Sequence, residues 1–281
     1  AEKTLEWLKR SKFYQESNHL WLHRVDRLGV RQISNVDGEV YADDQLLGIL
    51  AEYKVGDPRE AERRYEELKK SVLFNSSKEE WYWRASDQLD EVYTPRLDTD
   101  HQLLGLIVLC AAGHVSDAQK KYQKLGEEYY NSEYKCWNFC KNEIGRLVIA
   151  DKNNDIYRTQ LYDDLLQTFL RPHAHISLTP PPDEGSLATA TNRLLSVLIE
   201  ARGGRRNEAR DRLRTLQEST LFDKQNNFWN LWWNEDGKNA SGLYIARDQL
   251  LAVWAMKEAE VSAIEGESQI QSLPEQKKFN T

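Results

Sequence analysis

Seven charged side chains lie in the few residues before three segments that read Gln-Leu-Leu. A carboxyl group facing a second acidic or basic group can transfer protons, as in the cleavage of a glycosidic bond. If the three segments begin parallel helices, all seven side chains converge on one end of those helices. The set is Asp43, Asp44, Asp98, Asp100, His101, Arg247 and Asp248.

The aspartates also have a purely structural interpretation. Asp is a favoured N-cap, because its carboxylate accepts the unpaired N–H groups of the first helical turn. Asp43 or Asp44 suits this role. His101 and Arg247 break the acidic pattern at their positions, which favours a functional role for both. The candidate catalytic residues are Asp44, Asp98, Asp100, His101 and Asp248, and Arg247 is a candidate substrate contact.

Tryptophan forms a second candidate set, with nine residues in the chain. Four of them recur at a fixed place in a repeat, which indicates packing between helices. Trp83, Trp232 and Trp233 do not recur, and an exposed indole is a platform for a sugar ring or a prenyl chain. Trp232 and Trp233 also precede two acidic residues and a glycine. The candidate substrate-binding residues are therefore Trp83, Trp232, Trp233, Glu235, Asp236 and Arg247.

The repeat itself is the clearest feature of the chain. An aromatic residue is followed seven positions later by Trp, then by an Asp-rich stretch, a Gln-Leu-Leu segment, a Gly, an Ala and a Leu. Fixed internal periods mark repeat architectures. The aromatic pairs are Tyr14/Trp21, Phe74/Trp81, Tyr130/Trp137 and Phe222/Trp229.

Each module predicts a loop, an apolar helix, a Gly turn and a charged helix. A helix that is apolar on most sides is buried on most sides, and one with a single apolar stripe lies outside. We expect Leu46, Leu103, Leu194 and Leu250 to be equivalently buried. The modules are spaced by 56 or 57 residues, longer than the 34 of tetratricopeptide repeats. The pattern thus favours an all-α fold, an α/α toroid of repeated helical hairpins, over an open solenoid.

One domain over residues 1–263 accounts for the modules, because no linker separates them. Module three is longer and predicts an insertion at about 141–187, with an extra helix at about 157–170 and a proline-rich end. Residues 264–281 read as a tail. The length fits a complete small toroid or an incomplete one.

A family resemblance follows from three segments, residues 44–58, 221–229 and 246–255. Each is similar to the inner-helix unit of the six-hairpin α/α-toroid superfamily, which includes N-acylglucosamine 2-epimerase-like isomerases, glycosidases and polysaccharide lyases. The resemblance is at the level of the repeat. The paired catalytic histidines of the epimerases have no clear counterparts here.

Composition limits the partners. The net charge of −7 argues against nucleic acid, and no apolar run is long enough to span a bilayer. Three cysteines make no disulfide framework and fit a reducing, cytoplasmic compartment, with a secreted or processed form left open. His173 and His175 lack neighbouring ligands, so we expect no metal and no cofactor. The oligomeric state is not determined by the sequence.

Three functions remain. The first is a carbohydrate-active enzyme, a hydrolase, lyase or isomerase that acts on a small sugar or glycan in an acidic, Trp-lined cavity. The second is a non-catalytic helical-repeat module that binds proteins. The third rests on Asp98-Thr99-Asp100-His101, which resembles the Asp-x-Asp-Asp motif of class II terpene cyclases but has His at the fourth position.

Overall fold

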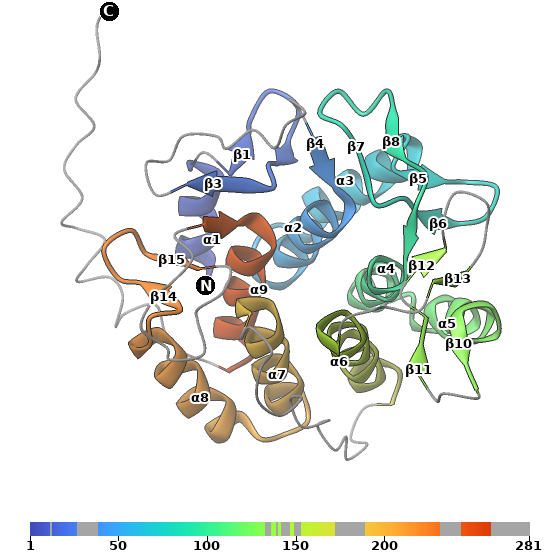
Figure 1. Ribbon diagram of the computed structural model, residues 1–281. Coiled ribbons are helices and arrows are strands. Elements are labelled where there is room, and N and C mark those ends of the chain that lie inside the picture. The colour runs from blue at the N-terminus through green and yellow to red at the C-terminus, as the bar shows by residue number, and fades with distance from the viewer. Residues whose placement is uncertain are drawn as a thin grey trace, which may run out of the picture.

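The computed structural model describes residues 1–11, 13–26, 39–132, 136–138, 140–141, 147–148, 153–171, 189–230 and 243–259. Helices dominate these residues and short strands join them (Figure 1). The helices are α1 (Glu2–Lys9), α2 (Ala42–Val55), α3 (Pro58–Lys70), α4 (Thr99–Ala111), α5 (Val115–Tyr129), α6 (Asn153–Leu170), α7 (Ala190–Arg202), α8 (Arg206–Glu218) and α9 (Ala246–Glu258).

The strands are two or three residues long. They are β1 (Tyr14–Gln15), β2 (Leu20–Trp21), β3 (Arg24–Asp26), β4 (Glu39–Tyr41), β5 (Phe74–Asn75), β6 (Glu80–Trp81), β7 (Arg84–Ser86), β8 (Val92–Thr94), β9 (Leu97–Asp98), β10 (Tyr130–Asn131), β11 (Cys136–Trp137), β12 (Cys140–Lys141), β13 (Leu147–Val148), β14 (Phe222–Asp223), β15 (Phe228–Trp229) and β16 (Leu243–Ile245).

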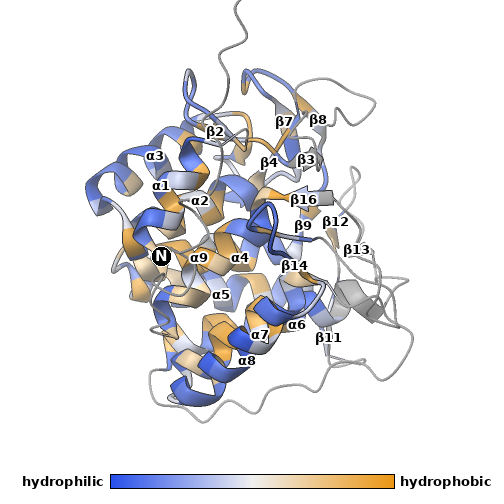
Figure 2. Ribbon diagram, turned by 90° about the vertical axis from the view of Figure 1, so that its left-hand side faces the viewer, coloured by the Kyte–Doolittle hydropathy of each residue, from blue (hydrophilic) through white to orange (hydrophobic). Residues whose placement is uncertain are grey.

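Inner helices form a closed series of contacts. α2 packs on α4, α4 on α6, α6 on α7, α7 on α9, and α9 returns to α2. α3, α5 and α8 pack outside α2, α4 and α7, and α1 packs on α9. Figure 1 looks along this ring, and Figure 2 shows hydrophobic α4 and α9 inside hydrophilic α3 and α8. The α/α-toroid prediction is confirmed.

The four leucines that define the inner helices are buried as predicted. Leu46, Leu103 and Leu194 are 0% exposed and Leu250 is 1% exposed. α6 lies within the predicted insertion, and the structure makes it a member of the inner ring, between α4 and α7. None of the described helices is long and apolar enough to cross a membrane.

The aromatic-to-Trp spacing produces β-hairpins, where the sequence pattern predicts loops. Tyr14 pairs with Trp21 across β1 and β2, and the other three aromatic pairs are equivalent. In each hairpin the two aromatic rings lie on neighbouring strands, with ring centroids 4.6–5.4 Å apart. Such cross-strand aromatic contacts are stabilising. Packing, predicted for the recurring Trp residues, is therefore their role.

The repeated Gln secures each hairpin to its inner helix. Gln102 Oε1 accepts from the backbone N–H of Trp81 at 2.8 Å, and Gln102 Nε2 donates to the Trp81 carbonyl at 2.7 Å. Gln45 and Gln249 hold Trp21 and Trp229 in the same way. The indoles of Trp21 and Trp81 rest on Gly48 and Gly105: a Cβ on Gly105 would lie 2.4 Å from Trp81 Nε1.

Strands also join successive modules and close the ring. The strand before an inner helix pairs with a strand of the next module: β16 with β3, β4 with β7, and β9 with β12. The first of these pairs joins the C-terminal module to the N-terminal one. All three pairs lie at the ends where the inner helices begin, so these helix starts form one layer, seen at the side of the ring in Figure 2.

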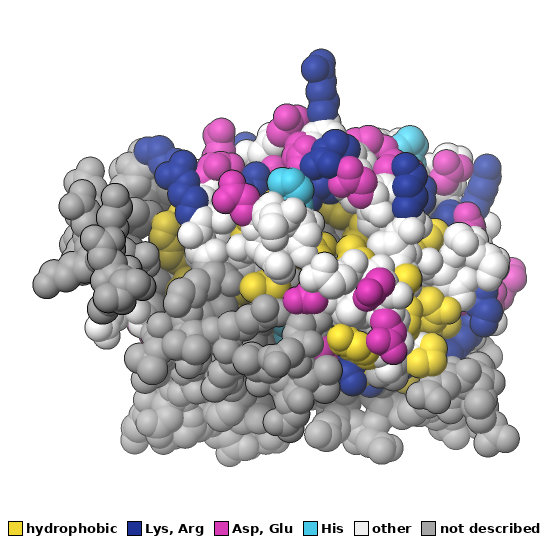
Figure 3. Space-filling model, turned by 90° about the horizontal axis from the view of Figure 1, so that it is seen from above, with side chains coloured by type: hydrophobic (Ala, Val, Ile, Leu, Met, Phe, Trp, Pro, Cys, Tyr) yellow, Lys and Arg dark blue, Asp and Glu magenta, His cyan; other side chains and the backbone are white. Residues whose placement is uncertain are grey.

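Charged side chains of both signs cover the described outer surface. Figure 3 shows acidic and basic side chains intermixed, with small hydrophobic patches between them. Outer helix α3 contributes several such pairs, including Arg63 with Glu60 and Lys69 with Glu66. Mixed charges of this kind are typical of a solvated surface.

Candidate functional site

Six of the seven predicted charged residues lie in the first turns of α2, α4 and α9, and Asp98 lies at the N-cap of α4. Tyr41 is the N-cap of α2, so Asp43 and Asp44 are the second and third helical residues. The capping interpretation is thus wrong for both. Asp98 does occupy the N-cap position of α4, yet its side chain makes no capping bond. A β-strand leads directly into each of these helices. The carboxyl groups at the helix starts therefore pair with basic residues of neighbouring inner helices.

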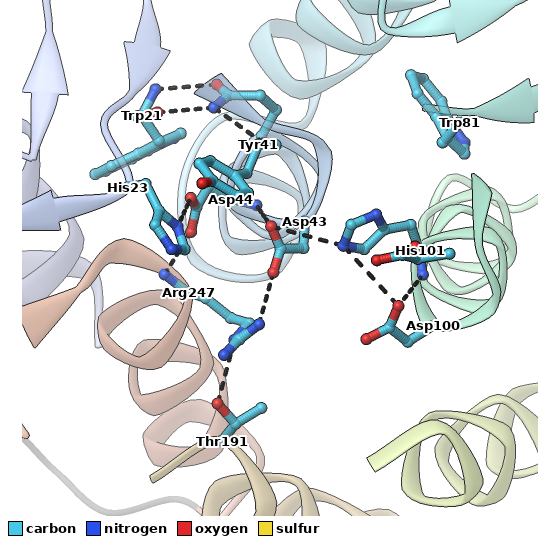
Figure 4. Close-up of polar contacts among 12 residues, drawn as sticks. Trp21, His23, Tyr41, Asp43, Asp44, Trp81, Asp100, His101, Thr191 and Arg247 are labelled. Atoms are coloured by element: carbon cyan, nitrogen blue, oxygen red, sulfur yellow. Dashed lines mark hydrogen bonds and ion pairs between the residues drawn. The ribbon is translucent and has the colours of Figure 1, made fainter. Parts of the chain in front are cut away.

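Arg247 connects three inner helices. From α9, its guanidinium donates to Asp43 Oδ2 on α2 at 2.8 Å and to Thr191 Oγ1 on α7 at 3.1 Å (Figure 4). Its backbone N–H donates to Asp44 Oδ1 at 2.8 Å. The side chain is 13% exposed. Arg247 therefore holds the starts of α2, α7 and α9 at one level.

Asp44 and His23 form a dyad, in which the His23 side chain is 14% exposed. Asp44 is fully buried, and its Oδ2 lies 2.7 Å from His23 Nδ1. Tyr41 stacks on the imidazole with ring centroids 3.9 Å apart. Burial raises the pKa of Asp44, His23 opposes this and Asp43 adds to it. A carboxylate that accepts from Nδ1–H fixes the tautomer and leaves Nε2 as a base, the arrangement of many histidine bases.

His101 lies between two carboxylates. Its Nε2 is 3.8 Å from Asp43 Oδ1 and 3.9 Å from Asp100 Oδ1, distances of ion pairs rather than hydrogen bonds. Burial alone would lower the pKa of His101, but Asp100, Asp43 and Asp98 outweigh it and raise it to about 9. His101 is thus a buried cation at neutral pH.

Asp43 and Asp100 are buried anions that complete this arrangement. Burial alone would raise the pKa of each. His101 and Arg247 hold that of Asp43 well below its usual value, and Arg158 on α6 and His101 lower that of Asp100. Arg158 Nε donates to Asp100 Oδ2 at 2.8 Å. This pairing brings α6 into the network.

Asp98 pairs with Arg96, which lies two positions earlier in the chain, between β8 and β9. Arg96 contacts both of its oxygens, at 2.6 and 2.7 Å. Burial, reinforced by Asp100, raises the pKa of Asp98. Asp98, Asp100 and His101 have potential ligand atoms within 4.8 Å of one another. Arg96, Arg158 and the proton on His101 already balance these carboxylates, so the cluster suits hydrogen bonding better than a metal ion.

Asp248 is a buried carboxyl group with a raised pKa. It is fully buried, Thr191 Oγ1 donates to its Oδ1 at 2.5 Å, and its ion pair with Arg247 is long, at 4.0 Å. Burial raises its pKa to about 6 against the opposing effect of Arg247. Its Oδ2 is buried without a hydrogen-bond partner. A carboxyl group that titrates near neutral pH can donate a proton as a general acid.

Trp83 lies beside this network. It is half-buried, the Arg96 and Arg84 guanidiniums stand 3.7 and 4.4 Å from its ring, and Tyr41 meets it edge-on. The other predicted substrate-binding residues, Trp232, Trp233, Glu235 and Asp236, lie outside the described residues. The structure therefore brings together Asp44, Asp98, Asp100, His101, Arg247 and Asp248, with Trp83 at their side.

Four members of the network, Arg96, Arg158, Thr191 and His23, were not predicted from the sequence. The contacts of Arg158 and Thr191 depend on helix packing, and His23 lies between β2 and β3. His23 stands two residues after Trp21, as Trp83 does after Trp81, and both rings contact Tyr41. Aligning the repeats at this position reveals the histidine as a departure, and would have singled it out.

A pocket on the outside of the ring is separate from the network. It lies between α3 and α5, over α4 and the β5–β6 hairpin, with an apolar floor that includes Tyr65, Leu106 and Leu109. None of the network's ionisable residues lines it. The charged network at the helix starts is therefore separate from this pocket.

Comparisons with known proteins identify the architecture. No protein-family model matches the chain, and no curated protein matches its sequence. Solved structures do match. An α-amylase described as novel, from Clostridium perfringens, has 10% identity and a TM-score of 0.59, covering 92% of this chain and 96% of that one. The fold is that of α/α-toroid proteins.

Two sugar epimerases match as well. The cellobiose 2-epimerase of Spirochaeta thermophila has 8% identity and a TM-score of 0.54, covering 88% of this chain and 92% of that one. A sugar epimerase from a ruminal bacterium has 10% identity and a TM-score of 0.52, covering 83% and 72%. At these identities the likeness concerns the fold alone.

Proposed function

We propose that the protein is an enzyme that acts on a neutral sugar by acid–base proton transfer, as an isomerase or epimerase. The observation that carries this proposal is the His23–Asp44 dyad at the same helix ends as Asp248. Both His23 and Asp44 act electrostatically on Asp248. A base and an acid at one place are the groups that proton abstraction beside a carbonyl requires.

The proton transfers that we propose use His23 as the base and Asp248 as the acid. His23 Nε2 takes the proton from the carbon next to the carbonyl of an open-chain sugar, and the C–H electron pair forms the carbon–carbon double bond of an enediol. Asp248 gives its proton to the carbonyl oxygen. For the ketose, His23 gives its proton to the former carbonyl carbon, and the hydroxyl on the neighbouring carbon returns its proton to the Asp248 carboxylate. For the epimer, the enediol turns its other face to His23, which protonates the original carbon, and the hydroxyl on the former carbonyl carbon returns its proton to Asp248. Atoms and charge balance in both cases.

Charge supports a neutral substrate. Four ionised carboxyl groups, those of Asp43, Asp44, Asp98 and Asp100, are matched by Arg96, Arg158, Arg247 and protonated His101, while the proposed proton transfers use Asp248 and His23 in their neutral forms. A site for an acidic sugar would carry surplus positive charge. The same pairing disfavours the terpene cyclase-like hypothesis, because Asp98 and Asp100 are each bonded to an arginine.

Solved structures lend support at the level of fold. Two of the similar chains are described as a sugar epimerase and a cellobiose 2-epimerase. Glycoside hydrolysis is a second candidate, favoured by the raised pKa of Asp248, since such an acid protonates a leaving-group oxygen. The similarity in fold to a chain described as an α-amylase supports hydrolysis as this second candidate.

Incubation with mannose, glucose, fructose and cellobiose in D2O tests the proposal. Proton NMR should show a new sugar and deuterium at the carbon beside the carbonyl, and His23→Gln should abolish both. Cleavage of cellobiose without deuterium incorporation would replace the proposal with hydrolysis. No reaction with any sugar would favour the non-catalytic interaction module.

A further inference from the structure

Tyr162 is a buried residue of α6 that the network described above does not use. It is 1% exposed and lies one helical turn after Arg158, so the two share a face of α6. Arg158 places that face beside Asp100 of α4. The charges of Arg247, Asp43, Asp100 and Arg158 all act on the Tyr162 hydroxyl. The Tyr162 hydroxyl is therefore within electrostatic reach of the charged network.

The Tyr162 hydroxyl makes no hydrogen bond. Buried tyrosine hydroxyls ordinarily find a partner, because an unpaired one loses its hydration without compensation. Burial raises the pKa of Tyr162, Arg247 opposes this, and Asp43 and Asp100 add to it. The group therefore remains a neutral hydroxyl, able to donate one hydrogen bond and to accept others.

Other unpaired atoms occur at the same layer of the ring. His101 Nδ1, Asn192 Oδ1 and Asp248 Oδ2 are buried without hydrogen-bond partners. These three residues hold the third position of α4, α7 and α9 respectively. Asp44 holds the same third position in α2, but both of its carboxylate oxygens are hydrogen-bonded. Four consecutive inner helices, α4, α6, α7 and α9, thus each present an unpaired buried group.

The chemistry of these groups defines what would satisfy them. Protonated His101 and Tyr162 offer donors, Asn192 offers an acceptor, and Asp248 offers a donor when protonated and an acceptor when ionised. A ligand with several hydroxyl groups matches such a mixed set, since each hydroxyl both donates and accepts. We propose that Tyr162 is a sugar-binding residue whose hydroxyl is kept unpaired in the free protein to hydrogen-bond directly to a substrate hydroxyl. This inference rests on the proposed function for the identity of the ligand.

Tyr162→Phe tests the proposal, because it removes one unpaired oxygen and nothing else. The free variant should melt at the same temperature as the wild type or higher. Its affinity for the sugar that turns over, or for any of the four that stabilises the protein, should fall about tenfold or more. KM should rise accordingly. Thermal melting with and without sugar, and isothermal titration, measure both effects.

Tyr129→Phe is the matched control. Tyr129 is also fully buried, but its hydroxyl donates to Glu80 at 2.8 Å, on the outer side of α4. This variant should lose stability and keep its sugar affinity. If Tyr162→Phe behaves in the same way, its hydroxyl is only a structural, water-bonded group and the proposal is overturned.

The outcomes separate this proposal from the function on which it rests. Sugar binding without turnover, weakened by Tyr162→Phe, would overturn the enzyme and leave the sugar-binding role. Turnover with an unchanged KM in Tyr162→Phe would overturn the role and leave the enzyme. A wild-type protein that neither binds nor converts any of the sugars overturns both.

Discussion

The backbone N–H of Arg247 donates to Asp44 Oδ1 at 2.8 Å, although 203 positions separate the two residues. The bond joins the start of α9 to the start of α2, and so joins the last described helix to the first inner one. Arg247 also reaches Asp43 and Thr191. The charged residues are therefore one network only because the ring closes.

Asp248→Asn and Asp100→Asn should separate catalysis from stability. Asp248→Asn keeps the acceptor for Thr191 and removes the proton donor, so turnover should fall by about 100-fold or more while stability is kept. Asp100→Asn leaves Arg158 without its carboxylate and should lower the free energy of unfolding by roughly 2–4 kcal/mol. Urea denaturation and sugar turnover check both. Equal loss of stability in the two variants would count against these roles.

Turnover should depend on the protonation of Asp248. Its pKa is raised to about 6, so the acid form, and with it kcat/KM, should decline as pH rises through this value. The pH profile of kcat/KM for the wild type shows whether this decline occurs. The profile of Asp248→Asn should lack the decline, and a variant that retains it would assign the titration to another group.

Stability should fall in alkaline solution because of His101. Its folded pKa, about 9, lies above the unfolded value of 6.5. The proton thus stabilises the fold fully below pH 6.5, and that stabilisation, on the order of 3 kcal/mol, is lost as pH rises towards 9. Unfolding free energies across this window measure the loss. His101→Gln should flatten the curve, and an unchanged slope in that variant would rule out this cause.

Two glycine substitutions should have opposite effects. A Cβ at Gly105 would lie 2.4 Å from Trp81 Nε1, so Gly105→Ala should destabilise the protein by about 1–3 kcal/mol. A Cβ at Gly126 of α5 meets nothing within 4 Å, so Gly126→Ala should stabilise it by roughly 0.5–1 kcal/mol through helix propensity. Thermal melting compares them. A stabilising Gly105→Ala would show that Trp81 does not pack on this helix.

Loss of the glutamine that holds Trp81 should be costly. Gln102→Met keeps the length of the side chain but leaves the buried N–H and C=O of Trp81 unpaired, which should cost about 2–4 kcal/mol. Gln123→Met, on the exposed face of α5, is the matched control and should be nearly neutral. Urea denaturation measures the free energy of unfolding of both variants. Similar losses in the two would refute the role of Gln102 in holding Trp81.

Much of the fold follows from the sequence. Leu46, Leu103, Leu194 and Leu250 mark buried inner helices because apolar residues on nearly every side of a helix can be satisfied only by burial. The recurring Trp residues were predicted to pack, and they do. The hairpins were not predicted, because two-residue strands carry no periodicity. Gly113 and Gly204 end their helices with positive φ, as the turn spacing indicates, whereas Gly56 does not.

The sequence by itself determined the repeat, the inner and outer helices and the level at which the charged residues lie, because local periodicity and turn chemistry depend on near neighbours. Only the tertiary structure decided which charges are paired and which polar atoms are left over. Asp44 and Asp248 occupy the same place in their repeats, yet one is bonded to His23 and Arg247 and the other keeps a free oxygen. Their pKa values depend on burial and on charges brought from distant helices, which no local pattern encodes.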